Sequence, residues 1–160
     1  MTQFRADKDL AFMLQYENVA WYDAGEVRIL DRRIYPAKIE FVRCKTHGEV
    51  AQAIADMVTQ SAGPYTAAAM GMALAAYECR EKSKEEQLAS LRAAGDTISN
   101  ARPTTAGRMR MICDGCLRAA ELALEEGRPV DLAIREHAVD TNNRRYSKVN
   151  EIAKYLVPLI

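Results

Sequence analysis

The stretch of residues 42–76 constrains the fold more than any other part of the chain. Thr46 followed by Glu49 has the spacing of a capping box, in which the hydroxyl and the carboxylate satisfy free backbone donors of a first helical turn. Apolar residues then recur with the period of one helical face, at Val50, Ala53, Ile54, Met57 and Val58. This spacing predicts an amphipathic helix that turns these side chains inward.

A second helix of a different kind is expected directly afterwards. The segment Ser61-Ala62-Gly63-Pro64 breaks the first helix, and residues 67–76 then carry only small or apolar side chains. A helix without a polar face is buried on all sides. We therefore expect this helix at the centre of the molecule, with the rest of the chain packed around it.

Short strands are predicted before this pair of helices. Residues 18–22 and 26–30 have strand composition and are joined through Asp23-Ala24-Gly25, a link of hairpin length, and residues 39–44 form a third candidate. A short helix is expected over residues 9–16. A sheet of three short strands is stable only when it packs against other elements, so it should lean on the helices.

Two more helices are predicted after the central pair. Ser83 and Glu86 repeat the capping-box spacing and open a helix with Leu88, Leu91 and Ile98 inward, which fades at Gly95 or a little beyond. Pro103 then occupies the first position of a long helix, where its missing N–H does no harm, and Gly127 ends that helix.

The last part of the chain is predicted to form two separate helices. One covers residues 129–139, and Ser147 caps the other. The apolar residues of the last helix are expected to be buried: Val149, Ile152, Ala153, Leu156 and Val157. The predicted fold class is α+β and mainly α, with a small three-stranded antiparallel sheet followed by a helical bundle. We expect a single domain over residues 1–160, with the N-terminal helix and sheet in 1–45 and the bundle in 46–160.

Composition and charge limit the classes of partner. Lys plus Arg and Asp plus Glu both number 22, so the net charge is zero and no global field favours nucleic acid or an acidic membrane. The apolar run of residues 67–77 is far shorter than the roughly 20 residues of a membrane span. Charged residues at positions 7–9 interrupt any signal peptide. We expect a cytoplasmic protein with reduced cysteines and with neither nucleic acid nor membrane as partner.

Cys113 and Cys116 have the Cys-x-x-Cys spacing that serves zinc or redox chemistry elsewhere. A zinc site needs further ligands, and Cys44 and Cys79 stand alone. Both members of the pair fall on the apolar face of a predicted helix, where cysteine acts as a small hydrophobe. The prediction is therefore core packing, with no metal and no cofactor.

The remaining polar candidates have weaker signals. His47, beside a helix cap, and His137, on a short helix, have no nucleophile at an informative spacing, so we expect solvated or packed imidazoles. The segment Arg102-Pro103-Thr104-Thr105 is at a helix start, where free N–H groups and an arginine can hold a phosphate, and Arg108 would add charge. A plain proline-started helix explains it equally well. Residues 140–145 are predicted to be a solvated connection between helices.

Several of these pieces resemble a known family when they are taken in order. They are V-R-C-K-T-H-G-E-V-A-Q-A-I-A-D-M-V, the hairpin V-A-W-Y-D-A-G-E-V-R-I-L-D-R-R-I-Y-P, the small-residue helix with Gly71, and A-R-P-T before the long helix. Together they resemble the N-terminal domain of methylthioribose-1-phosphate isomerase. Relatives of that enzyme include ribose-1,5-bisphosphate isomerase and regulatory subunits of translation initiation factor 2B. The resemblance covers most of residues 19–106.

The resemblance implies a sheet and bundle as above, followed in the family by a Rossmann-like C-terminal domain with a catalytic cysteine and aspartate. This sequence stops at Ile160, so we expect no Rossmann-like domain and no catalytic residue here. The family holds its sugar phosphate partly with an Arg-Gly-Ala-Pro motif, where this chain has Gln60-Ser61-Ala62-Gly63-Pro64. Loss of a charge-assisted phosphate contact costs about 1.5–3 kcal/mol. Arg102 matches a second phosphate-contacting arginine.

The predicted sugar-phosphate site thus consists of Arg102, Thr104, Thr105, Gln60 and Ser61. The first hypothesis for function is a non-catalytic binding or interaction module. The alternative is one half of a split aldose–ketose sugar-phosphate isomerase that works with a separate Rossmann-like catalytic subunit, so enzyme activity stays open at this point. A zinc or thiol site at Cys113 and Cys116 is a third. We expect a homo-oligomer or a protein partner that supplies the missing domain.

Overall fold

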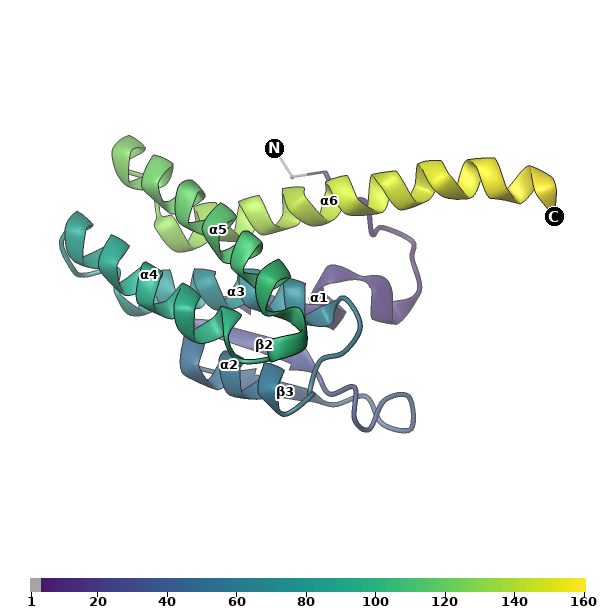
Figure 1. The fold of residues 1–160 in the computed structure, drawn as a ribbon, viewed down its shortest axis with the longest axis horizontal. Helices are drawn as coiled ribbons and strands as arrows, with labels where there is room; N and C mark the ends of the chain where they lie inside the picture. The colour runs from purple at the N-terminus through teal and green to yellow at the C-terminus, as the bar shows by residue number, and fades with distance from the viewer. Residues whose placement is uncertain (1–3) are drawn as a thin grey trace.

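The computed structural model describes residues 4–160 (Figure 1). A three-stranded antiparallel sheet in the order β1-β2-β3 is followed by a bundle of helices, so the expected α+β, mainly helical class is confirmed. The elements, in chain order, are η1 Phe12–Leu14, α1 Tyr16–Val19, β1 Ala20–Asp23, β2 Glu26–Leu30, β3 Phe41–Cys44, α2 His47–Ala55, α3 Gly63–Glu78, α4 Lys84–Ser99, η2 Pro103–Thr105, α5 Ala106–Glu126, α6 Val130–Leu156 and η3 Val157–Leu159.

The predicted hairpin is present, with β1 paired to β2 from Ala20–Ile29 to Asp23–Glu26. Its turn consists of Ala24 and Gly25, which both have positive φ angles of 44° and 83°. Two-residue turns of that hand match the twist of antiparallel strands. Gly25 is also required sterically, because a Cβ there would lie 2.5 Å from Cε1 of Tyr77. The first strand starts two residues later than predicted, since residues 18 and 19 belong to α1.

The capping box at Thr46 and Glu49 is confirmed, and α2 ends at Ala55 in a Schellman motif. The Val58 N–H donates to the Ala53 carbonyl at 3.0 Å, and the Met57 N–H donates to the Ile54 carbonyl at 3.3 Å. Met57 takes the left-handed conformation of this motif, with φ 61°. Its side chain is 40% exposed, so the prediction that it continues the buried face was wrong. The helix had already ended there.

Helix α3 is the central element, as the sequence predicts. Its residues from Gly63 to Ala76 are buried apart from Tyr65, and it packs against α2, α4, α5, α6 and the sheet. The close approach depends on Gly71, where a Cβ would come within 2.9 Å of Val50 Cγ1 and 3.1 Å of Ile98 Cδ1. Small side chains therefore allow four helices to surround one.

The next two helices agree with prediction except at the start of the second. The capping box of Ser83 and Glu86 is present, and α4 ends at Ser99, a little beyond Gly95 as expected. Pro103 begins a 3-10 turn, and the α-helix itself starts only at Ala106. Gly127 ends α5 in the left-handed conformation. The proline therefore starts a short entry turn and not the long helix directly.

The C-terminal part differs most from expectation, because α6 is one continuous helix from Val130 to Leu156. Residues 140–145 are helix interior and not a connection, and Ser147 caps nothing. No Gly or Pro interrupts the sequence between positions 130 and 156, so nothing breaks the helix. Its last turns extend beyond the bundle (Figure 1) and expose Val149, Ile152, Leu156 and Val157, which were predicted to be buried.

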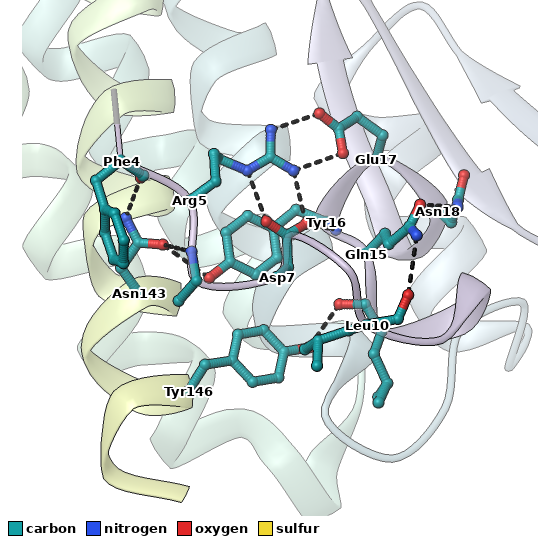
Figure 2. Close-up of polar contacts among 12 residues, drawn as sticks. Phe4, Arg5, Asp7, Leu10, Gln15, Tyr16, Glu17, Asn18, Asn143 and Tyr146 are labelled. Atoms are coloured by element: carbon teal, nitrogen blue, oxygen red, sulfur yellow. Dashed lines mark hydrogen bonds and ion pairs between the residues drawn. The ribbon is translucent and has the colours of Figure 1, made fainter. Parts of the chain in front are cut away.

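The N-terminal segment also departs from prediction, since no helix runs over residues 9–16. Asp9 has a positive φ of 69°, and a 3-10 turn and the short α1 follow. The Asp7 carboxylate is buried and accepts a hydrogen bond from the Tyr16 N–H at 2.6 Å and bonds from the Arg5 guanidinium (Figure 2). Arg5 also pairs with Glu17. This network holds the N-terminal segment in a folded-back conformation. A continuous helix over residues 9–16 could not adopt that conformation.

Across residues 4–160 we find no helix with the length and apolarity required to pass through a bilayer.

Candidate functional site

A cavity of about 270 Å³ lies beside the turn that leads into α3. Gln60 and Ser61, two residues of the predicted site, line it together with Ala62 and Gly63 at the start of the helix. Ser61 has a positive φ of 57°, and the Gly63 N–H donates to the Gln60 carbonyl at 2.9 Å. No side chain caps α3 at Ala62. The Gly63 N–H is used within the turn, Pro64 has no N–H, and the Tyr65 N–H donates to the Ala62 carbonyl at 3.2 Å, so these three positions of α3 offer the cavity the positive end of the helix dipole and no free N–H group.

Two arginines that the sequence analysis did not single out line the same cavity. Arg32 follows β2, and Arg145 comes from α6. The Arg32 Nε atom is buried and has no hydrogen-bond partner among residues 4–160, although its backbone N–H donates to the Val58 carbonyl at 2.8 Å. Its guanidinium carbon lies 5.9 Å from the centre of the Tyr35 ring. No acidic residue lines the cavity, so the positive charge there is not neutralised by its walls.

The other three predicted site residues lie elsewhere, at the connection between α4 and α5. Arg102 precedes the η2 turn, and the Thr105 hydroxyl donates to its carbonyl at 3.4 Å. Thr104 is exposed. None of the three lines the cavity beside Gln60. Of the five predicted site residues, Gln60 and Ser61 are the two that line this cavity.

There are clear reasons why the sequence did not identify Arg145 and Arg32 as site residues. Arg145 lies in a stretch interpreted as a connection, and only an uninterrupted helix places it on a defined face. The lack of Gly and Pro between positions 130 and 156 was the signal that could have identified that helix. Arg32 stands directly after a strand, and nothing in the local sequence indicates that the turn before α3 lies against it.

The cysteines do not form a reactive site. All four thiols are buried. Burial raises the pKa of the Cys44 thiol to about 11 and that of Cys113 to about 12, and it also raises the pKa of Cys79 and Cys116. The predicted core position of Cys113 and Cys116 is confirmed. In the part of the chain described here, no group of three or more His, Cys, Asp or Glu residues could hold a metal ion.

Histidine 47 lies at the start of α2, where its Nδ1 is 2.5 Å from Glu78 Oε2. It is partly exposed and is paired with an acidic residue of α3, as a packed surface imidazole would be. His137 is half-buried within α6 and lines another cavity together with Cys116, a thiol whose pKa is raised by burial. Neither histidine lines the cavity beside Gln60.

The sequence of this chain is similar to part of several known proteins. No protein-family model matches the chain. A methylthioribose-1-phosphate isomerase from Caldanaerobacter subterraneus subsp. tengcongensis is 30% identical over 144 residues, which are 81% of this chain and 40% of that protein. One from Roseiflexus castenholzii is 39% identical over 90 residues, which are 54% of this chain and 25% of that protein. The chain therefore spans at most about two fifths of the length of these relatives.

Solved structures give the same result. The 5-methylthioribose 1-phosphate isomerase of Pyrococcus horikoshii superposes with a TM-score of 0.60 at 26% identity, over 82% of this chain and 36% of the other. Subunit delta of translation initiation factor eIF-2B from A. fulgidus superposes with a TM-score of 0.62 at 26% identity and with the same coverage. The chain is therefore related, over most of its length, to the N-terminal domain of the family that includes methylthioribose-1-phosphate isomerase and eIF-2B subunit delta.

Proposed function

We propose that this chain is a binding module of the sugar-phosphate isomerase family that holds a phosphorylated sugar beside Gln60 without catalysing its isomerisation. One observation carries the proposal. Arg32 and Arg145 line one cavity together with the start of α3, and the buried Nε of Arg32 has no partner among residues 4–160. Guanidinium groups bind phosphate through charge-assisted hydrogen bonds, and the positive end of the α3 dipole adds to the attraction.

The arrangement also accounts for Gln60. The family resemblance implies an arginine at this turn, and its replacement by glutamine removes one positive charge. Arg32 and Arg145 reach the same cavity from other elements and supply positive charge in its place. We infer that the phosphate contact has moved from the turn to these two side chains.

The absence of catalysis is proposed from the chemistry of the cavity wall. Interconversion of an aldose and a ketose requires a group that accepts and returns a proton beside the substrate carbons. The walls of this cavity contain no carboxylate, imidazole or thiol. The cysteine thiols lie in the core, and burial raises their pKa values, so they are poor proton acceptors at neutral pH.

The test is calorimetric titration of the purified chain with 5-methylthioribose 1-phosphate. We expect saturable binding that weakens about tenfold or more in Arg32→Gln and in Arg145→Gln, the loss typical of one charged hydrogen bond. Arg33→Gln is the matched control, because Arg33 is exposed and pairs with Asp31 outside the cavity. Binding that survives both cavity substitutions, or no binding at millimolar ligand, would contradict the proposal. Loss only in Arg102→Ala would place the ligand at the α4–α5 connection instead.

A second candidate function is one half of a split aldose–ketose isomerase, completed by a separate catalytic subunit. The observation in its favour is the apolar surface on the last turns of α6, where Ile152 is 59% and Tyr155 80% exposed. Exposed apolar patches of this kind mark protein interfaces. Sedimentation velocity separates the options: a dimer that Ile152→Glu dissociates indicates self-association. A monomer that gains isomerase activity with the separately expressed C-terminal part of a relative supports the split enzyme.

A further inference from the structure

A second cavity, of about 230 Å³, lies between α3, α5 and α6. It shares no lining residue with the cavity beside Gln60. Consecutive arginines of α6 separate the two, because Arg144 lines the second cavity and Arg145 lines the first. Its volume is below the roughly 300–1,000 Å³ of pockets for drug-sized molecules, so any ligand is small.

Three arginines line this second cavity and no acidic residue does. Arg108 and Arg118 come from α5, one near its start and one three turns later, and Arg144 comes from α6. The Arg144 Nη2 donates to the Thr141 hydroxyl at 3.0 Å. The cavity therefore gathers positive charge that its own walls do not balance.

This positive charge also lowers the pKa of His137, which lines the same cavity. Burial lowers the pKa of His137, Arg144 and Arg118 lower it further, and Asp140 opposes them. Burial is the largest of these causes, and two guanidiniums from different helices add to it. Gly115 leaves room for this ring, because a Cβ there would lie 3.0 Å from its Nε2.

Two buried polar side chains complete the wall. Thr66 of α3 is 3% exposed and Asn142 of α6 is 7% exposed, and both line the cavity. Among residues 4–160 the one buried side-chain polar atom without a partner is Arg32 Nε, so the Thr66 hydroxyl and the Asn142 amide are not orphaned buried groups. The Asn142 amide and the Thr66 hydroxyl can donate hydrogen bonds to a molecule bound against this wall.

We propose that the cavity between α3, α5 and α6 is a second anion site, which binds a small phosphate ester through Arg108, Arg118 and Arg144 and through hydrogen bonds from Asn142 and Thr66. Its apolar wall, with Met111 and Ile112, contacts the carbon part of the ligand. This site goes beyond the function proposed above, since it uses other side chains of other elements. Each of the two sites can therefore be present without the other.

The experiment follows the backbone amide and side-chain amide signals of the ¹⁵N-labelled chain by NMR while inorganic pyrophosphate, and then ribose 5-phosphate, is added. We expect saturable shifts at Gly115 and at the Asn142 side-chain amide. The affinity should fall about tenfold in Arg118→Gln and further in the double variant with Arg144→Gln. Arg128→Gln is the control, because Arg128 is exposed, pairs with Glu126 and lies outside the cavity.

The outcomes separate the two proposals. Shifts at Gly115 that persist in Arg32→Gln but disappear in the Arg118→Gln, Arg144→Gln double variant establish the second site alone. Shifts confined to residues near Gln60 and abolished by Arg32→Gln overturn it and leave the first proposal standing. Absence of saturable shifts at millimolar pyrophosphate and ribose 5-phosphate also overturns it. Thr66→Val preserves the side-chain shape and is the variant that separates loss of binding from loss of folding. It should weaken binding without changing the overall spectrum, whereas a folding defect would change the spectrum.

Discussion

The Tyr16 hydroxyl donates a hydrogen bond to Asn143 Oδ1 at 2.9 Å, across 127 residues of sequence. Asn143 also accepts from the Ala6 N–H at 2.9 Å and donates to the Phe4 carbonyl at 2.7 Å (Figure 2). The Tyr16 ring stacks on Tyr146, with ring centres 5.3 Å apart. The N-terminal segment therefore fixes the middle of α6, and this is the part of the helix that presents Arg144 and Arg145 to the two cavities.

Asn143→Leu should destabilise the protein by about 2–3 kcal/mol, because it leaves the Tyr16 hydroxyl and two backbone groups without their partner. Chemical denaturation followed by circular dichroism measures the change. Ser147→Ala, one turn later on the exposed face of α6, is the control and should stay within about 0.5 kcal/mol of the parent. An Asn143→Leu variant as stable as that control would show that the network contributes nothing.

Gly71→Ala should destabilise the protein by about 1–3 kcal/mol. The added methyl group would come within 2.9 Å of Val50 Cγ1 and would overpack the contact between α2 and α3. Gly107→Ala is the matched control on another helix, because nothing lies within 4 Å of a Cβ there, and it should be neutral or stabilising by up to about 1 kcal/mol. Thermal unfolding of the two variants gives the comparison. The same sign of change in both would refute the steric argument.

The cysteines should be inert toward a thiol reagent such as Ellman's reagent at pH 8. A thiol of pKa about 11, as at Cys44, is ionised only to about a thousandth at that pH, and burial blocks the reagent as well. In concentrated guanidinium chloride all four thiols should react. Rapid reaction of one or two thiols in the native protein would revive the redox hypothesis for Cys113 and Cys116.

Stability should decline as the pH falls below about 6.5, the ordinary pKa of histidine, because the folded state lowers the pKa of His137. Above that pH the imidazole is neutral in both states and its contribution is fully present. Below it, the unfolded chain takes up a proton that the folded chain resists, so the free energy of unfolding decreases. Urea denaturation at pH 5 and pH 7.5 measures this.

His137→Gln is the comparison for that experiment, and it should flatten the change between the two pH values. Asp31, whose pKa the Arg33 hydrogen bonds lower, acts only at more acidic pH. The same pH dependence in His137→Gln and in the parent would assign the effect to other groups.

Local chemistry made the first half of the bundle predictable from sequence. The two capping boxes, the small-residue helix and the Asp23–Gly25 turn each depend on residues close together in the chain, and all are present. The misassigned parts have different reasons. The N-terminal segment is folded back by the hydrogen bonds of the Asp7 carboxylate with Arg5 and with the Tyr16 N–H, which local patterning does not show. Residues 140–145 were assigned to a connection because they are polar, although the lack of Gly and Pro between positions 130 and 156 was a local signal for one helix.

The same distinction applies to the candidate site. The family resemblance identified the turn at Gln60 and Ser61, and that turn does border a cavity. The arginines at the cavities could not be found by local reasoning, because their significance depends on which helices approach one another. Arg32 and Arg145 are separated by more than a hundred positions in the sequence and still line one cavity.

The exposed end of α6 should change its rate of amide hydrogen exchange when a partner protein binds to it. From Ser147 to Leu156 every side chain except Ala153 is exposed, so the backbone hydrogen bonds there are held by helix propensity alone. Isolated helical turns open often, and their amide protons should exchange with deuterium within seconds, while those of α3 are protected for far longer. Any protein that covers this apolar stripe would slow that exchange, and the tail of the helix would then act as a built-in reporter of assembly.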